Sequence, residues 1–182
     1  MLETNAHVQI LKLLQTKFQD KESPYAFRAL ACLGWMNAKG QKDLQSLDFA
    51  NILMKSIRTF SESVTFITEA CYALCGVFDG NKAETEKICA ESVSGEKLIL
   101  DILLDAVKKN PVNSRLAAKV SLALGSMSFA NGVSKQILQD KKIQRWKTLI
   151  SVYKTHRKDE ETLTWVSYAI QTNLQMIPAN ER

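Results

Sequence analysis

A glycine inside a helix-like apolar run recurs three times along the chain, and this recurrence restricts the possible folds more than any other feature. The glycines are Gly34, Gly76 and Gly125, and a fourth run carries Thr172 at the same place, so the copies lie 42, 49 and 47 residues apart. Arrays of stacked helices repeat with a period of roughly 40–47 residues. We therefore expect one helical repeat domain over residues 1–182. The expected repeat boundaries are roughly 1–38, 39–80, 81–130 and 131–178.

The four runs also share an apolar stripe. Positions nine, five and two residues before the glycine and two residues after it step by 4, 3 and 4, which is one face of an α-helix. All sixteen residues but Ser167 are apolar, aromatic or cysteine. We expect the stripe to pack in the core of every copy. Its members are Tyr25, Ala29, Cys32, Met36, Ile67, Cys71, Leu74, Phe78, Leu116, Val120, Ala123, Met127, Leu163, Ser167, Ile170 and Leu174.

A second amphipathic element precedes each of the three later runs. It lies at residues 48–57, 96–104 and 143–153, with an earlier copy at 7–14, and short helical pieces at 83–93 and 133–139 precede two of these. Pro24 and Pro111 are expected to open long helices, since proline suits a helix start. The chain has only seven Gly and three Pro, too few for the frequent turns of a strand-rich fold. The sequence therefore predicts an all-α fold.

Residues 69–81, Glu-Ala-Cys-Tyr-Ala-Leu-Cys-Gly-Val-Phe-Asp-Gly-Asn, resemble the third helix and exit turn of an armadillo repeat, whose pattern is E-A-x-W-A-L-x-N-[IL]-x-x-x-N. Residues 88–93 and 98–104 are similar to its first and second helices. The resemblance implies a right-handed α-solenoid of armadillo/HEAT-like repeats, with about three full repeats and partial ends. An Hsp70 cochaperone of the armadillo type is one hypothesis that depends on this resemblance alone.

Two positions depart from the family pattern. Armadillo proteins that resemble importin-α grip peptides with asparagine and tryptophan ladders, whereas glycine or Thr172 fills the asparagine position here, and Leu30, Tyr72, Ser121 and Tyr168 fill the tryptophan position. Binding of nuclear localisation signals in the importin-α manner is therefore not expected. Glycine within a helix costs about 1 kcal/mol relative to alanine. Its recurrence indicates either close approach of two helices, which we favour, or a groove that must stay open.

The resemblance implies a concave groove lined by the third helices. We expect the protein to be a non-catalytic protein–protein interaction or scaffold module that binds a partner peptide or helix there. For the aromatic members, packing between repeats is the alternative interpretation. The candidate groove residues are Glu69, Tyr72, Asp79, Ser121, Trp165 and Tyr168.

A basic segment gives the second functional hypothesis, because residues 135–158 hold eight cations and one acid, Asp140. This local charge of +7 exceeds the net +5 of the whole chain. Such a patch attracts nucleic acid or another polyanion. A solvated helix face is the alternative. The patch comprises Lys135, Lys141, Lys142, Arg145, Lys147, Lys154, Arg157 and Lys158.

Catalytic and metal-binding motifs are missing from the sequence. The two histidines, His7 and His156, lie near opposite ends, and no nucleotide-binding or zinc-protease motif occurs. We expect no enzyme activity, no cofactor and no metal. The four cysteines, Cys32, Cys71, Cys75 and Cys89, lie in helix-like runs and are expected to be buried, reduced thiols. No signal peptide or membrane span is present, so we expect a cytoplasmic protein, with the nucleus as an alternative.

The ends of the chain lack polar caps. Residues 7–18 are apolar at many positions, and the stripe on residues 163–174 has no following helices to cover it. Terminal repeats of a solenoid need a polar outer face. We therefore expect either a longer repeat protein of which this is a part, or an end buried against a partner or a second copy.

Overall fold

The structure, a computed structural model, describes residues 9–10, 23–34, 38–46, 48–78, 98–128 and 145–175. These residues form helices and contain no strand, which confirms the predicted all-α class for this part of the chain. None of the helices in these ranges is both long enough and apolar enough to cross a bilayer. The helices are α2 (Ser23–Gly34), α3 (Ala38–Ser46), α4 (Phe49–Thr59), α5 (Val64–Phe78), α7 (Ile99–Lys109), α8 (Ser114–Ser128), α10 (Arg145–Thr155) and α11 (Glu160–Gln175).

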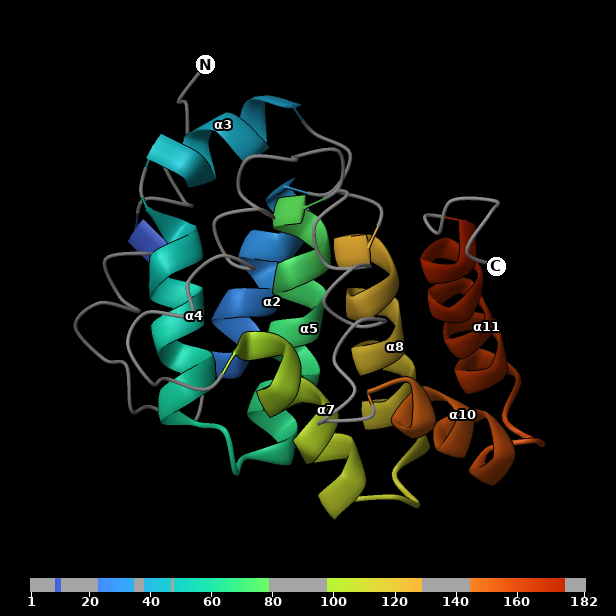
Figure 1. The fold of residues 1–182 in the computed structure, drawn as a ribbon. Helices are drawn as coiled ribbons and strands as arrows, with labels where there is room; N and C mark the ends of the chain where they lie inside the picture. Colours follow the sequence, from blue (N-terminus) through green and yellow to red (C-terminus); the bar gives the residue numbers. More distant parts are fainter. Residues whose placement is uncertain are drawn as a thin grey trace.

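The helices form two layers (Figure 1). In the long-helix layer, α2 packs against α5, α5 against α8, and α8 against α11, so these four helices stand side by side across the figure. In the short-helix layer, α7 contacts both α4 and α10, and the three helices pack on α5, α8 and α11. Helix α3 contacts α2 and α4.

All four helices of the long-helix layer run in the same direction. Near their starts, the Thr162 hydroxyl of α11 donates to the Ser114 carbonyl of α8 at 3.0 Å. Near the end of α5, Gly76 lies against Ala31 in the second half of α2. Each helix of the short-helix layer joins its long partner through a four-residue turn, as in α4 to α5. Such short turns make antiparallel pairs, so one helical hairpin follows another along the layers.

The predicted core stripe is confirmed in the two central long helices. Every described side chain of the stripe in α5 and α8 is at most 1% exposed. The neighbours on both sides of α5 and α8 explain this, since each helix packs between two others. These buried stripe residues are Ile67, Cys71 and Leu74 in α5 and Leu116, Val120, Ala123 and Met127 in α8.

The stripe prediction is wrong for the two outer long helices. Tyr25 is 54% exposed, and Ala29 and Cys32 are exposed as well, while α2 buries Phe27 and Leu30 against α5 instead. On α11, Ser167 is exposed and Leu163 is only half-buried. An outer helix of the layer has one long-helix neighbour among the described residues, so only the side facing that neighbour becomes core.

Close helix approach explains two of the helical glycines. A Cβ atom on Gly76 would lie 2.5 Å from the Ala31 carbonyl oxygen and 2.9 Å from the Ala31 Cα. A Cβ atom on Gly125 would lie 2.5 Å from the ring of Tyr168. The first of the two alternatives, close packing, is therefore confirmed at both positions. The surroundings of Gly34 lie outside the described side chains.

The second amphipathic elements form helices where they were predicted, as α4, α7 and α10. The start of α8 differs from its prediction, because Pro111 lies in the turn before Ser114 and does not open the helix. Pro24 does lie in the first turn of α2. The predicted pieces at 83–93 and 133–139 lie outside the described residues, as does 7–14 apart from residues 9–10.

Candidate functional site

Side-chain caps fix the starts of three long helices. Ser63 accepts the Phe66 N–H at 3.3 Å before α5, and Asn113 accepts the Leu116 N–H at 3.0 Å before α8. Asp159 accepts the Thr162 N–H at 2.8 Å before α11. Each cap satisfies a backbone donor that the first turn leaves free. The caps set which residues of the first turns face the neighbouring helix.

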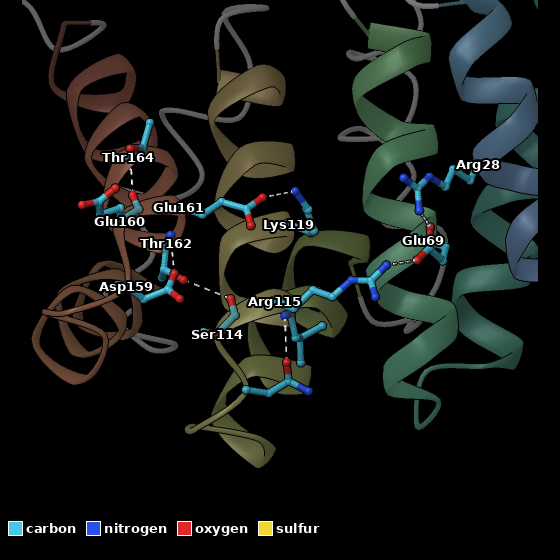
Figure 2. A network of polar contacts seen from close by, with 12 residues as sticks. Arg28, Glu69, Ser114, Arg115, Lys119, Asp159, Glu160, Glu161, Thr162 and Thr164 are labelled. Carbon is cyan, nitrogen blue, oxygen red and sulfur yellow. Dashed lines mark hydrogen bonds and ion pairs between the residues drawn. The ribbon is translucent and has the colours of Figure 1, made fainter.

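A buried carboxylate on α5 joins three long helices through ion pairs. Glu69 is 2% exposed, and its Oε2 accepts a hydrogen bond from Arg28 Nη1 of α2 at 3.5 Å. Its Oε1 accepts one from Arg115 Nη2 of α8 at 2.8 Å. Figure 2 shows the two arginines reaching Glu69 from opposite sides. Since a buried carboxylate needs partners for its charge, Glu69 holds both guanidinium groups at the surface.

Tyr72 lies one turn further along α5 and contacts two cations. The Arg28 Cζ lies 4.9 Å from the centre of the Tyr72 ring, and the Lys119 Nζ lies 4.6 Å from it. Both distances are within the range of attraction between a cation and an aromatic face. The ring is therefore contacted by one cation from α2 and one from α8.

Lys119 continues the polar network to the last long helix. The lysine is 7% exposed, and its Nζ donates a hydrogen bond to Glu161 Oε1 of α11 (Figure 2). Burial by itself lowers the pKa of Lys119, but hydrogen bonds with Glu161 and Tyr72 outweigh it and raise the pKa above the usual lysine value. Lys119 is therefore a charged link between α8 and α11.

Two aromatic residues occupy the same layer on α11. The Trp165 and Tyr168 rings make an edge-to-face contact, with centroids 6.2 Å apart and planes at 81°. Both side chains are half-buried, and the Tyr168 ring covers Gly125. The glycine thus leaves the space into which the tyrosine ring packs.

A hollow of about 300 Å³ opens at the beginning of the long helices. We call it the Arg115 hollow. Tyr25 of α2 lies at its edge and is the most exposed aromatic residue in the described part of the chain. The hollow is lined by Tyr25, Val64, Thr65, Thr68, Glu69, Asn113 and Arg115.

The candidate groove residues differ in their location and burial. Glu69, Tyr72, Trp165 and Tyr168 all lie on the long-helix layer, but the Glu69 carboxylate is already held by two arginines. Ser121 is 1% exposed. The side chain is packed within the layer, because α8 has long helices on both sides. Asp79 lies outside the described residues.

Three cations of the network were not among the candidates: Arg28, Arg115 and Lys119. Arg28 and Lys119 stand at the same position of their helices, six residues before the glycine of each run. A cation repeated at one position of alternate copies is the signal that identifies them. Arg115 has no such counterpart in the other runs.

The described part of the basic patch lies on α10 and the turn after it. Lys147, Lys154, Arg157 and Lys158 are exposed there. Tyr153, on the same helix, is 44% exposed. Arg145 begins α10, but its side chain lies outside the description, as do Lys135, Lys141 and Lys142.

The cysteines divide into buried and exposed residues. Cys71 and Cys75 are buried on α5, whereas Cys32 on α2 is exposed, and all three are free thiols. Burial raises the pKa of Cys71 well above the usual value, and the neighbouring Cys75 adds to the shift. The expectation of burial is therefore wrong for Cys32, which lies on the outward side of an outer helix. Cys89 lies outside the described residues.

Within the described ranges, no three histidine, cysteine or acidic residues lie close enough together to hold a metal ion. Compared with protein-family models, with curated proteins and with solved structures, the chain shows no match.

Proposed function

We propose that this protein is a non-catalytic interaction module built as a right-handed armadillo/HEAT-like solenoid. It binds an extended segment or a helix of a partner protein across the long-helix layer. The observation that carries the proposal is a continuous row of polar and aromatic side chains, in which α2, α5, α8 and α11 each contribute a member. Extended partners lie along such stacked helices in repeat proteins.

The chemistry of this row is that of an interface. Tyrosine, tryptophan and arginine are enriched among the few residues that contribute most of the binding energy of a protein interface. Tyr72, Trp165 and Tyr168 are each half-buried, so part of every side chain is accessible at the surface. The ion pairs hold the arginines in place before a partner arrives, which reduces the entropy lost on binding.

A peptide selection tests this proposal. Random peptides selected on the purified protein are mapped by hydrogen exchange, and we expect protection along the long-helix layer. The Trp165→Ala variant should weaken binding at least tenfold, because a large aromatic contact is lost. Tyr153→Ala on α10 is the matched control and should have no effect. Protection confined to α4, α7 and α10, or equal affinity of Trp165→Ala and wild type, would refute the proposal.

Docking on nucleic acid or another polyanion through α10 is the second candidate function. The exposure of Lys147, Lys154, Arg157 and Lys158 favours it, together with the exposed Tyr153. Phosphate contacts weaken steeply between low and moderate salt, by roughly tenfold or more for a few contacts. The test measures the affinity of a single-stranded oligonucleotide at low and moderate salt, for the wild type and for a charge-reversal variant at Lys154. An affinity that changes neither with salt nor with the charge reversal would refute this candidate function.

The proposed compartment is the cytoplasm, with the nucleus as the alternative. Three free thiols in the described part of the chain support it, because reduced cysteines are typical of these compartments.

A further inference from the structure

The Arg115 hollow adjoins a cluster with an excess of positive charge, because Glu69, which lines the hollow, also pairs with Arg28, which does not line it. One carboxylate, Glu69, meets two guanidinium groups, Arg28 and Arg115, so the cluster carries a charge of about +1. The Arg115 side chain is 62% exposed although it is ion-paired. Its contact to Glu69 uses one of the five N–H donors of a guanidinium group. The remaining donors of Arg115 are available to a second acceptor.

The geometry of the hollow suits a flat, charged acceptor next to an apolar group. Arg115 is fixed at one wall by its 2.8 Å contact with the buried Glu69. Tyr25 of α2, 54% exposed, also lines the hollow, and Thr65 and Thr68 line it from α5, the helix between α2 and α8. A guanidinium group held in one orientation binds a carboxylate through two parallel hydrogen bonds.

From this arrangement we infer that the Arg115 hollow binds a single aspartate or glutamate side chain of an extended segment in a partner protein. This inference depends on the proposed function and names the chemistry of the partner. Arg115 provides the hydrogen bonds, Tyr25 covers the aliphatic part of the bound side chain, and Glu69 is a positioning residue that keeps Arg115 in place.

Charge along the layer favours a peptide over a nucleic acid here. Beyond α8, the first turn of α11 carries Glu160 and Glu161, and Glu161 remains 54% exposed although it pairs with Lys119. A phosphate polymer lying along the layer would meet these carboxylates. A peptide with an acidic residue at the hollow and neutral or basic residues toward α11 complements the charge of Arg115 and that of the α11 carboxylates.

Selection of random peptides on the wild-type protein and on two Arg115 variants tests the inference. We expect peptides selected on the wild type to share an acidic residue at one position. Their affinity should fall at least tenfold for Arg115→Gln, because the bidentate contact is lost. Arg115→Lys should lose less, since it retains the charge and the pairing with Glu69. The matched control is Arg157→Gln, an exposed arginine on the turn after α10.

The outcomes separate this inference from the proposed function. Peptides that bind the long-helix layer without acidic enrichment, or with equal affinity for Arg115→Gln, would overturn the acidic partner and leave the interaction module standing. Failure to select any peptide that protects this layer would overturn both. Far-UV circular dichroism checks that each variant is folded. If Arg115→Gln does not fold, the affinity of the selected peptides for Arg115→Lys is the deciding measurement. An affinity equal to that for the wild type would then overturn the inference. Tighter binding of single-stranded RNA than of the selected peptides, lost in Arg115→Gln, would also overturn it.

Discussion

Replacement of Gly76 by alanine tests the close approach of α2 and α5 directly. In an ordinary exposed helix this change stabilises the protein by about 1 kcal/mol, because alanine restricts the unfolded chain and favours the helix. At Gly76 the added Cβ would lie 2.5 Å from the Ala31 carbonyl oxygen and 2.9 Å from the Ala31 Cα. These are backbone atoms of a packed helix, so no side-chain rotation relieves the overlap.

The magnitude follows from the balance of the two effects. Overpacking a well-packed core costs roughly 1–3 kcal/mol, and more where the backbone must move. A separation below 3 Å forces α2 and α5 apart, so the upper half of that range applies, about 2–3 kcal/mol, and the gain in helix propensity offsets about 1 kcal/mol. We expect Gly76→Ala to reduce the free energy of unfolding by about 1–2 kcal/mol. For a chain of this size, the melting temperature should fall by roughly 2–8 °C.

Urea unfolding followed by far-UV circular dichroism measures the effect. Gly125→Ala is the control, because its Cβ would meet the ring of Tyr168, a half-buried side chain that can rotate away. It should destabilise the protein less than Gly76→Ala does. If Gly76→Ala proves as stable as the wild type or more stable, α2 and α5 do not approach as closely as described, and the reasoning fails.

Three further predictions follow from burial and charge. Leu74→Asp should unfold at least the α4–α5 hairpin, because Leu74 is 0% exposed and burying an unpaired carboxylate costs several kcal/mol; an unchanged thermal melt would contradict this. A thiol reagent should label Cys32 rapidly and Cys71 and Cys75 slowly in the native protein, since they differ in burial and burial raises the pKa of Cys71; equal rates, followed by mass spectrometry, would disprove it. Hydrogen bonds from the side chain and the backbone N–H of Thr162 lower the pKa of Asp159. Its stabilising effect should be complete above its unfolded pKa of about 4 and be lost as the pH falls through the lower folded pKa. Asp159→Asn keeps the cap and should remove this acid-side dependence, as measured by unfolding at several pH values.

The amount of the fold that the sequence predicts depends on the position of each helix. The apolar stripe was right for Ile67 and Leu74 in α5, because that helix has long neighbours on two sides. The same pattern was wrong for Tyr25 and Cys32 in α2, which is an outer helix. Periodicity identifies which residues share a face, but it does not state how many faces have a neighbour.

One helix escaped prediction because it has no apolar periodicity. Helix α3, Ala38–Ser46, reads Ala-Lys-Gly-Gln-Lys-Asp-Leu-Gln-Ser, and Leu44 is its one large apolar residue. Gly40 lowers its helix propensity further. Its contacts with α2 and α4 hold it in place, with Leu44 2% exposed. Tertiary packing of a single residue is not visible in a sequence pattern.

For the candidate site, the sequence predicted the layer better than the chemistry. The resemblance placed Tyr72 and Glu69 on the long-helix layer, where they lie, but it treated Glu69 as free to contact a partner. Glu69 pairs with Arg28, which lies 41 positions before it in the sequence, and with Arg115, which lies 46 positions after it. Such pairing depends on which turns of neighbouring helices stand side by side, and that register comes from the packing and the caps.

The antiparallel hairpins also determine the electric field around the molecule. Each helix has a partial positive charge of about one half at its beginning and an equal negative charge at its end. Because α4, α7 and α10 end where α5, α8 and α11 begin, the opposite partial charges lie close together and largely cancel. At a distance, the attraction of this protein for charged molecules is therefore governed mainly by its side chains, and dissolved salt will screen it.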